Sequence, residues 1–121
     1  MLYTSTTSFS SKEMQGVSFT IHRMSFARRI DLAQRIREEG RKLAFLESGQ
    51  GAGDKIDALV LGQEIEKLYF EWGLKEIQGL EIDGEPATPQ LLIERGPEGL
   101  CREIVEVIKS ECGLSEEERK N

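Results

Sequence analysis

Apolar residues recur along this chain first with the period of a strand and then with that of a helix. Between residues 16 and 24, Val17, Phe19 and Ile21 alternate with polar side chains, which is typical of a half-buried strand. From Ser25, a candidate N-cap, the apolar residues form one broad stripe at about 100° per residue. The stripe contains Phe26, Ile30, Ala33, Ile36, Gly40 and Leu43. The pattern predicts a short strand followed at once by a first core helix.

A second helix is predicted from Asp54 to about Trp72, after a glycine-rich break at residues 49–53. It carries two apolar stripes, so we expect neighbours to cover it on both sides. The first stripe is Leu61, Ile65, Leu68 and Trp72, and the second is Ile56, Leu59, Val60 and Phe70.

Turn residues and carboxylates crowd into residues 70–97, which we interpret as a connector between helical layers. Leu74–Ile77 and Leu80–Ile82 can form the arms of a very small hairpin. The first predicted strand, residues 17–23, can pair with it. The expected fold class is therefore α+β: a mainly helical single domain with an N-terminal strand and a small hairpin.

Two further helices are predicted near the end of the chain. Thr88 before Pro89 is a typical helix start, and Gly96 closes that short helix. The last helix follows from Pro97 and keeps its apolar residues on one side. These are Leu100, Cys101, Ile104, Val105, Ile108 and Cys112.

The domain is expected to span residues 15–114. Residues 1–14 are rich in Ser and Thr and have no apolar period, so they are expected to be a flexible N-terminal tail. Residues 115–121 are expected to be a flexible C-terminal tail, because a capping-box sequence there is followed by too few residues for another helix.

Charge and composition limit the class of protein. The net charge is −6, yet residues 1–42 carry +4 and residues 43–121 carry −10. We therefore expect no binding to nucleic acid, although the basic third can bind an acidic surface, including that of another copy. No apolar run approaches the roughly 18 residues of a membrane span, and no secretory signal is evident. We expect a cytoplasmic protein with two reduced cysteines and no membrane partner.

Candidate chemistry is sparse. The segment GQGAGDK resembles a phosphate-binding loop, but no buried strand precedes it, no Ser or Thr follows Lys55, and Asp54 would repel a phosphate. Glu81, Asp83 and Glu85 lack the spacing of a calcium loop. With one histidine in the chain, His-based metal sites and triads cannot form within one subunit. We expect no catalytic residue, no metal site and no cofactor, and therefore no enzyme.

Candidate interface residues are easier to name. Arg29 and Arg37 interrupt the apolar stripe of the first predicted helix, where each guanidinium must find a carboxylate within the chain or a partner's surface. Trp72 ends the second predicted helix. The acidic rim, defined as Glu81, Asp83 and Glu85, is expected to be exposed to partners.

Taken as a string, EWGLKEIQGLEIDGEPATPQLLIERGPEGLCREIVEVIKSECGLSEEERKN resembles the small tail-assembly proteins of tailed bacteriophages and prophages. The resemblance covers roughly residues 17–121, and rests on the order of elements, on GLEIDGEPATPQLLIERGP and on the ending GLSEEERKN. It implies a non-enzymatic tail assembly chaperone that binds tape-measure and tail-tube proteins and forms a homo-oligomer. It also implies a second, longer product made by frameshifting near the codons of Lys120 and Asn121. The alternative is a small bacterial protein-interaction or regulatory domain without catalytic activity.

Overall fold

The computed structural model describes residues 1–47 and 52–112 of the 121-residue chain. The described residues contain four helices, a three-stranded antiparallel sheet and a two-stranded hairpin, so the predicted α+β class is confirmed. The chain divides into two compact units, one from residues 1–24 and 69 onward and the other from residues 25–68. The predicted C-terminal tail, residues 115–121, lies outside the described residues.

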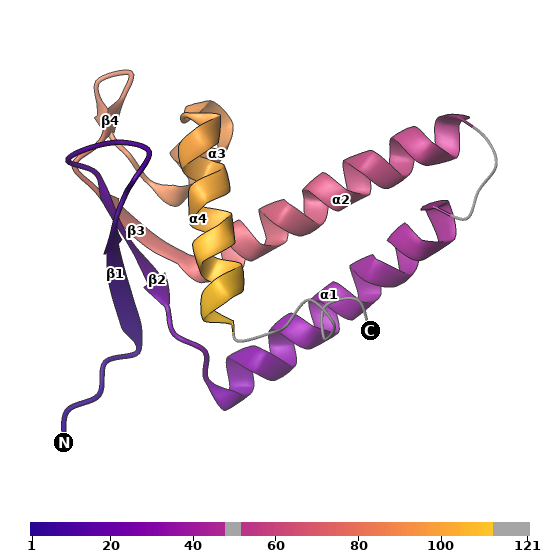
Figure 1. Ribbon diagram of the computed structural model, residues 1–121, viewed down its shortest axis with the longest axis horizontal. Coiled ribbons are helices and arrows are strands. Elements are labelled where there is room, and N and C mark those ends of the chain that lie inside the picture. Colours follow the sequence, from indigo (N-terminus) through magenta and orange to yellow (C-terminus); the bar gives the residue numbers. More distant parts are fainter. Residues whose placement is uncertain (48–51, 113–121) are drawn as a thin grey trace. The chain divides into compact units, whose positions relative to one another are not determined.

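The first unit is built on a sheet with the order β1 (Thr6–Ser10), β2 (Ser18–His22) and β3 (Leu74–Gln78) (Figure 1). All neighbours are antiparallel. The alternation that predicted the central strand also gives its burial, because Phe19 and Ile21 are fully buried. The expected pairing of this strand with the segment after the second helix is confirmed by the β2–β3 register.

Strand β1 corrects the expectation of a flexible tail for residues 1–14. Its sequence, TTSFS, has a single large apolar residue, so it shows no period by which a strand could be recognised. That residue, Phe9, lies opposite Phe19 in the register and stacks on it with ring centroids 5.9 Å apart. On the other face of the sheet the hydroxyl groups of Ser8 and Thr20 share a hydrogen bond of 2.8 Å. Two cross-strand contacts therefore order a segment that looks unstructured in sequence.

The small hairpin forms later in the chain than predicted. Strands β4 (Glu81–Ile82) and β5 (Glu85–Pro86) pair across a turn in which Asp83 and Gly84 both have positive φ, 52° and 83°. This is the preference of Asp-Gly for a tight hairpin turn. The predicted pairing of Leu74–Ile77 with Leu80–Ile82 is wrong, because β3 pairs with β2 and Glu81–Ile82 pairs with β5.

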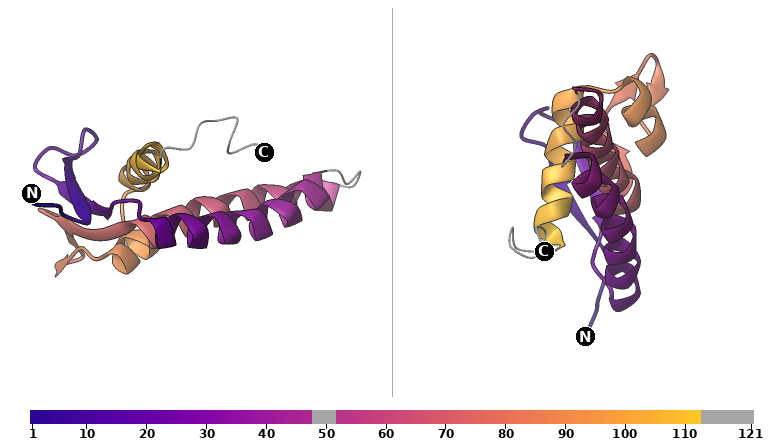
Figure 2. Two further views of the ribbon diagram at one scale, coloured as in Figure 1. Left: turned by 90° about the horizontal axis from the view of Figure 1, so that it is seen from below. Right: turned by 90° about the vertical axis from the view of Figure 1, so that its right-hand side faces the viewer.

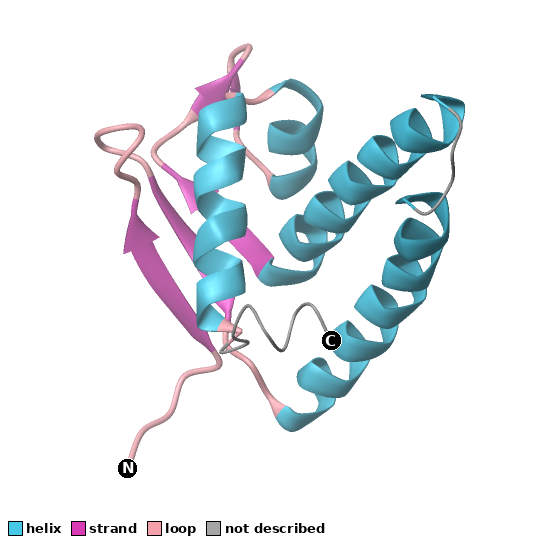
Figure 3. Ribbon diagram, turned by 45° about the vertical axis from the view of Figure 1, so that its right-hand side comes forward, coloured by secondary structure: helices cyan, strands magenta, loops and turns pink. Residues whose placement is uncertain are grey.

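Helices α3 (Pro89–Arg95) and α4 (Glu98–Glu111) confirm their sequence signals. The Thr88 hydroxyl oxygen accepts a hydrogen bond of 3.1 Å from the Leu91 backbone N–H, and Pro89 occupies the first turn. Helix α4 lies beside the sheet (Figure 3) and buries the predicted side. The buried side chains of α4 and its C-cap are Leu100, Ile104, Val105, Ile108 and Cys112. Both cysteines are free thiols, as expected.

The second unit is a helical hairpin formed by α1 (Phe26–Glu47) and the greater part of α2 (Ala52–Gly73). The last residues of α2, from Tyr69, belong to the first unit. The two helices run in opposite directions (Figure 2). The Ser25 hydroxyl oxygen accepts from the Arg28 backbone N–H at 3.2 Å, which confirms the predicted N-cap of α1.

Burial in the helical hairpin differs from the prediction. Phe26 and Ile30 begin the stripe that predicts a core helix, yet they are 86% and 47% exposed, whereas Leu32 is buried. On α2 the expected covering of the second stripe is wrong for Ile56, Leu59 and Val60, which are 63%, 67% and 50% exposed, whereas Phe70 of the same stripe is buried. Helical periodicity shows that a face is apolar, but it does not show that the same chain covers that face.

Candidate interaction surface

The described residues show neither a metal-binding cluster nor a membrane-spanning helix. No group of three His, Cys, Asp or Glu side chains among them is placed to hold a metal ion. No helix in the described ranges is long and apolar enough to cross a membrane. What stands out is apolar surface on the helical hairpin of residues 25–68.

Helix α1 carries an exposed apolar stripe along its length. Phe26, Ile30, Ala33 and Ala44 are all exposed and, at about 100° per residue, point within a sector about 60° wide. Arg37 lies inside this sector and is exposed as well. A stripe of this kind on a soluble helix ordinarily packs against another element.

Helix α2 has its own exposed apolar face. Ile56, Leu59 and Val60 are 63%, 67% and 50% exposed, and they lie on one side of the helix. The opposite side is not enclosed either, because Leu61 and Ile65 are only half-buried. The hairpin therefore lacks a closed core of its own among its described side chains, apart from buried residues such as Leu32 and Ala58.

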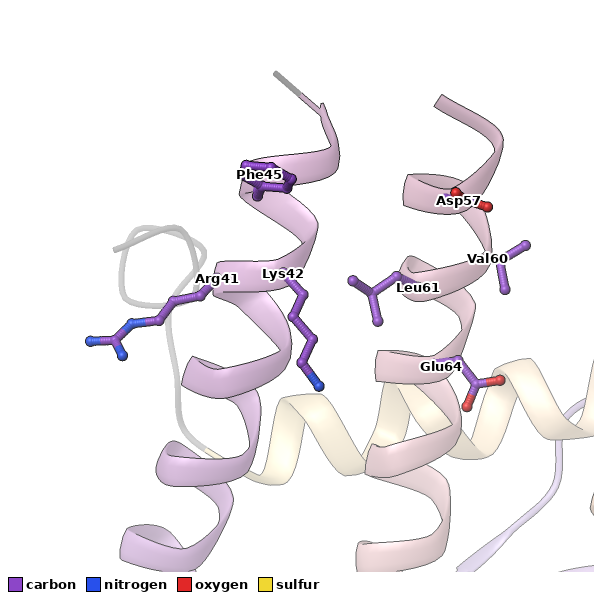
Figure 4. Close-up of a pocket in the computed structure, with 7 residues that line it drawn as sticks. All are labelled: Arg41, Lys42, Phe45, Asp57, Val60, Leu61 and Glu64. Atoms are coloured by element: carbon purple, nitrogen blue, oxygen red, sulfur yellow. The ribbon is translucent and has the colours of Figure 1, made fainter. Parts of the chain in front are cut away.

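An open groove of about 670 Å³ lies on one face of the hairpin, between the two helices (Figure 4). Its walls are Arg41, Lys42 and Phe45 of α1, and Asp57, Val60, Leu61 and Glu64 of α2. Leu61 and Lys42 point into the space between the helices, whereas Arg41 and Val60 point to opposite outer sides. Phe45, which is 78% exposed, lies against α1 near the end of that helix.

The two helices line the groove with side chains of opposite charge. Helix α1 contributes the cations, Arg41 and Lys42, and helix α2 contributes the carboxylates, Asp57 and Glu64. All four side chains are exposed. Lys42 forms an ion pair of 3.4 Å with Glu39 three residues earlier on α1. A groove with cations on one helix and carboxylates on the other suits a partner with the reverse arrangement of charge.

The predicted interface residues of α1 are placed on its surface. Arg29 and Arg37 are both exposed, so neither guanidinium is forced into the hairpin interior. On the surface of the same helix, Asp31 and Arg35 form an ion pair of 3.0 Å. Arg37 is the better interface candidate of the two, because it lies within the exposed apolar stripe.

The acidic rim belongs to the first unit and is partly engaged by a cation that the sequence did not suggest. Arg95 of α3 contacts Asp83 at 2.9 Å and Glu85 at 3.6 Å, and so ties the β4–β5 hairpin to α3. Glu81 is exposed on the same hairpin. Because the three side chains of these ion pairs are about half exposed or more, the pairs orient the hairpin and add little stability.

Trp72, the remaining predicted interface residue, is half-buried and also lies in the first unit. The predicted interface is thus divided between two units. The groove residues Phe45, Asp57, Val60 and Glu64 were missed. For Val60 the signal was the double stripe of α2, which we interpreted as contact with neighbours, whereas Phe45, Asp57 and Glu64 belong to neither stripe.

The thiol of Cys101 on α4 has a raised pKa. Burial raises the pKa of the Cys101 thiol above its ordinary value, and the nearby carboxylate of Glu98 raises it further. The thiol donates a weak hydrogen bond of 3.6 Å to the Leu92 carbonyl oxygen. Cys101 is therefore a protonated packing residue at neutral pH and a poor nucleophile.

In comparisons with known proteins, no family model matches this chain, and neither a curated protein nor a solved structure matches it.

Proposed function

We propose that this chain is a non-enzymatic protein of the tail-assembly-chaperone kind, which binds tape-measure and tail-tube proteins during phage tail morphogenesis in the bacterial cytoplasm. The family part of this proposal rests on the resemblance of residues 17–121. The binding part rests on one structural observation: both helices of the hairpin expose large apolar side chains, among them Phe26 and Ile30 on α1 and Leu59 and Val60 on α2.

Exposed apolar faces on two neighbouring helices favour binding to helical segments of other proteins. A partner helix with apolar residues three and four positions apart can place them on such a face. Tape-measure proteins, being long and helical, offer many segments of this kind, which is what the resemblance implies for the partner. Removing an apolar side chain from water stabilises such a contact by about 1.5–3 kcal/mol when its burial is complete.

The test is a binding measurement with two variants. Purified chain is titrated with the tape-measure and tail-tube proteins encoded at the same locus, and the double variant Leu59→Ser/Val60→Ser is compared with Gln63→Ser. All three positions lie on one exposed face of α2, but only the double variant removes apolar groups. We expect at least tenfold weaker binding for the double variant and little change for Gln63→Ser.

Two results would count against the proposal. The first is an unmutated chain that binds neither protein, and the second is a double variant that binds as tightly as the Gln63→Ser control. The first result would favour the alternative, a bacterial interaction or regulatory domain that uses the same hairpin for an unrelated protein. A locus without genes for tape-measure and tail-tube proteins would favour it too.

A further inference from the structure

We infer that the exposed apolar stripe of α1 binds one α-helix of a partner protein, and that this helix carries a carboxylate opposite Arg37. The inference rests on the proposed function and deepens it, because it names the chemistry of the helical segment that the hairpin binds. All the residues that it uses lie within the unit of residues 25–68.

The stripe has the spacing of a seam between two packed helices. Its positions follow one another in alternating steps of four and three residues, which is the heptad period of helices that pack along their length. At about 1.5 Å per residue, the stripe covers about 27 Å of helix. One partner helix of about twenty residues can therefore lie along all of it. The positions of the stripe are Phe26, Ile30, Ala33, Arg37, Gly40 and Ala44.

The stripe is open to such a helix. Phe26 is 86% and Ile30 47% exposed, and Ala33 and Ala44 are exposed as well. A Cβ built on Gly40 meets nothing within 4 Å. The small side chains therefore leave holes between the larger ones, and the apolar side chains of a partner helix can fill these holes.

The charge in the middle of the stripe determines which helix fits. Elsewhere on α1, Arg35 is paired with Asp31 at 3.0 Å and Lys42 with Glu39 at 3.4 Å. Arg37 forms no ion pair with any residue that the structure describes. Covering the stripe removes water from this guanidinium, which is unfavourable unless a carboxylate replaces the water. A guanidinium holds a carboxylate with two parallel hydrogen bonds, so a partner with Glu or Asp at this position satisfies it.

The flanks of the stripe favour the same partner. Arg29 and Arg41 lie on either side of it and are exposed, and Figure 4 shows Arg41 pointing away from α2. The carboxylates of Asp31, Glu38 and Glu39 lie on the remaining sides of α1. Because flanking charges set partner choice between packed helices, an acidic helix is favoured over a basic one. An anionic membrane surface is disfavoured, since a cation lies where an interfacial helix needs apolar side chains.

The test measures binding of two synthetic peptides to the full-length chain by isothermal titration calorimetry. Each peptide is about three heptads long and has Leu at its seam positions, except for one charged residue at the centre. The acidic peptide has Glu at that position and on both flanks, and the basic peptide has Lys at the same places. Repulsion between like flanks keeps each peptide from pairing with itself. We expect the acidic peptide to bind at least tenfold more tightly than the basic one.

Three variants separate pairing with Arg37 from a general effect of charge. Arg37→Glu should reverse the preference between the peptides. Arg35→Glu, the matched control about 160° away around the same helix, should keep that preference. Arg37→Leu makes the seam more apolar, yet it should bind the acidic peptide at least tenfold more weakly, because the central Glu is then buried without a partner. Circular dichroism shows whether each variant is folded.

The inference is overturned if the two peptides bind equally or not at all, or if Arg35→Glu changes the preference as Arg37→Glu does. It is also overturned if Arg37→Leu binds the acidic peptide as tightly as the unmutated chain. Vesicles of an anionic lipid that bind the chain when neither peptide does would overturn it too, and would assign the stripe to a membrane surface.

The tail proteins separate this inference from the proposed function. Binding of the tape-measure or tail-tube protein that is unchanged in Arg37→Glu overturns the inference and leaves the proposed function standing. A chain that prefers the acidic peptide through Arg37 but binds neither tail protein does the reverse.

Discussion

The carboxylate of Glu103 on α4 is expected to hold the connection between β1 and β2 in place. Its Oε1 accepts a hydrogen bond of 2.6 Å from the Ser11 hydroxyl, and its Oε2 accepts one of 2.6 Å from the Lys12 backbone N–H. The Ser11 oxygen in turn accepts from the Met14 backbone N–H at 3.0 Å. One side chain thus joins residues about ninety positions away to the helix. We predict that Glu103→Ala weakens this part of the fold.

The size of the loss follows from these two bonds. A hydrogen bond to a charged group contributes about 1.5–3 kcal/mol, although the exposure of the Lys12 bond reduces its share. After the substitution, water can reach the freed groups, so no full desolvation penalty remains. We expect the free energy of unfolding to fall by about 1–3 kcal/mol. Glu103→Gln keeps one carbonyl acceptor without charge, and about half of that loss is expected.

Urea denaturation measures the free energy of unfolding, with Glu106→Ala as the matched control. Glu106 lies on the exposed side of the same helix, so both substitutions change helix propensity equally. The control should change stability by no more than about 0.5 kcal/mol. Hydrogen exchange should also become faster at the Lys12 and Met14 amides in Glu103→Ala alone. Equal losses in the two alanine variants, with unchanged exchange at these amides, would refute the anchoring role.

Two further predictions concern the first unit. Gly79 has a φ of 82°, and a Cβ built there clashes with the Gly16 carbonyl oxygen, whereas Gly84 has a φ of 83° and open space around it. In thermal unfolding, the free energy of unfolding should fall by about 1 kcal/mol in Gly84→Ala because of the backbone conformation at that position. In Gly79→Ala it should fall by about 1–3 kcal/mol more because of the clash. Equal losses in the two variants would contradict this. For Cys101, burial and Glu98 raise the pKa in the folded state, so the stability it contributes is present at neutral pH and is lost as the pH rises through that pKa. Maleimide labelling followed by peptide mass spectrometry should accordingly show slower reaction in the folded than in the unfolded chain near pH 8, with the difference shrinking at higher pH, and equal rates would contradict the shift.

Local signals in the sequence were sufficient where one short segment determines the structure. The hydroxyl of Thr88 with Pro89 begins α3, and the positive φ values of Asp83 and Gly84 make the hairpin turn. In both cases the interaction lies within four residues, so no knowledge of the rest of the fold is needed. The single apolar side of α4 was predictable for a similar reason, because it has one stripe and one polar side.

Contacts between distant segments could not be obtained in this way. Strand β1 is ordered by Phe9 against Phe19 and by the bond from Ser11 to Glu103, and neither partner is visible in the segment itself. Residues 80–82 were predicted to pair with β3, but they contribute to a separate hairpin with β5. The sequence alone does not show which of several nearby strands will pair. Arg95 as the partner of the acidic rim was missed for the same reason.

The exposed stripe of α1 differs from the buried stripe of α4 in a way that is already visible in the sequence. Both α1 and α4 repeat apolar residues at helical spacing, yet Ile104 is fully buried while Phe26 is 86% exposed. The stripe of α4 contains no charged residue from Leu100 to Ile108, and Glu111 enters it only in the last turn, whereas Arg37 lies in the middle of that of α1. A cation inside a core costs several kcal/mol unless it is paired, but at the edge of an association surface it keeps its water until a partner arrives. A charge in the middle of an apolar stripe therefore argues against burial of that face in the core of the same chain, and in this protein the argument applies to α1 of the helical hairpin.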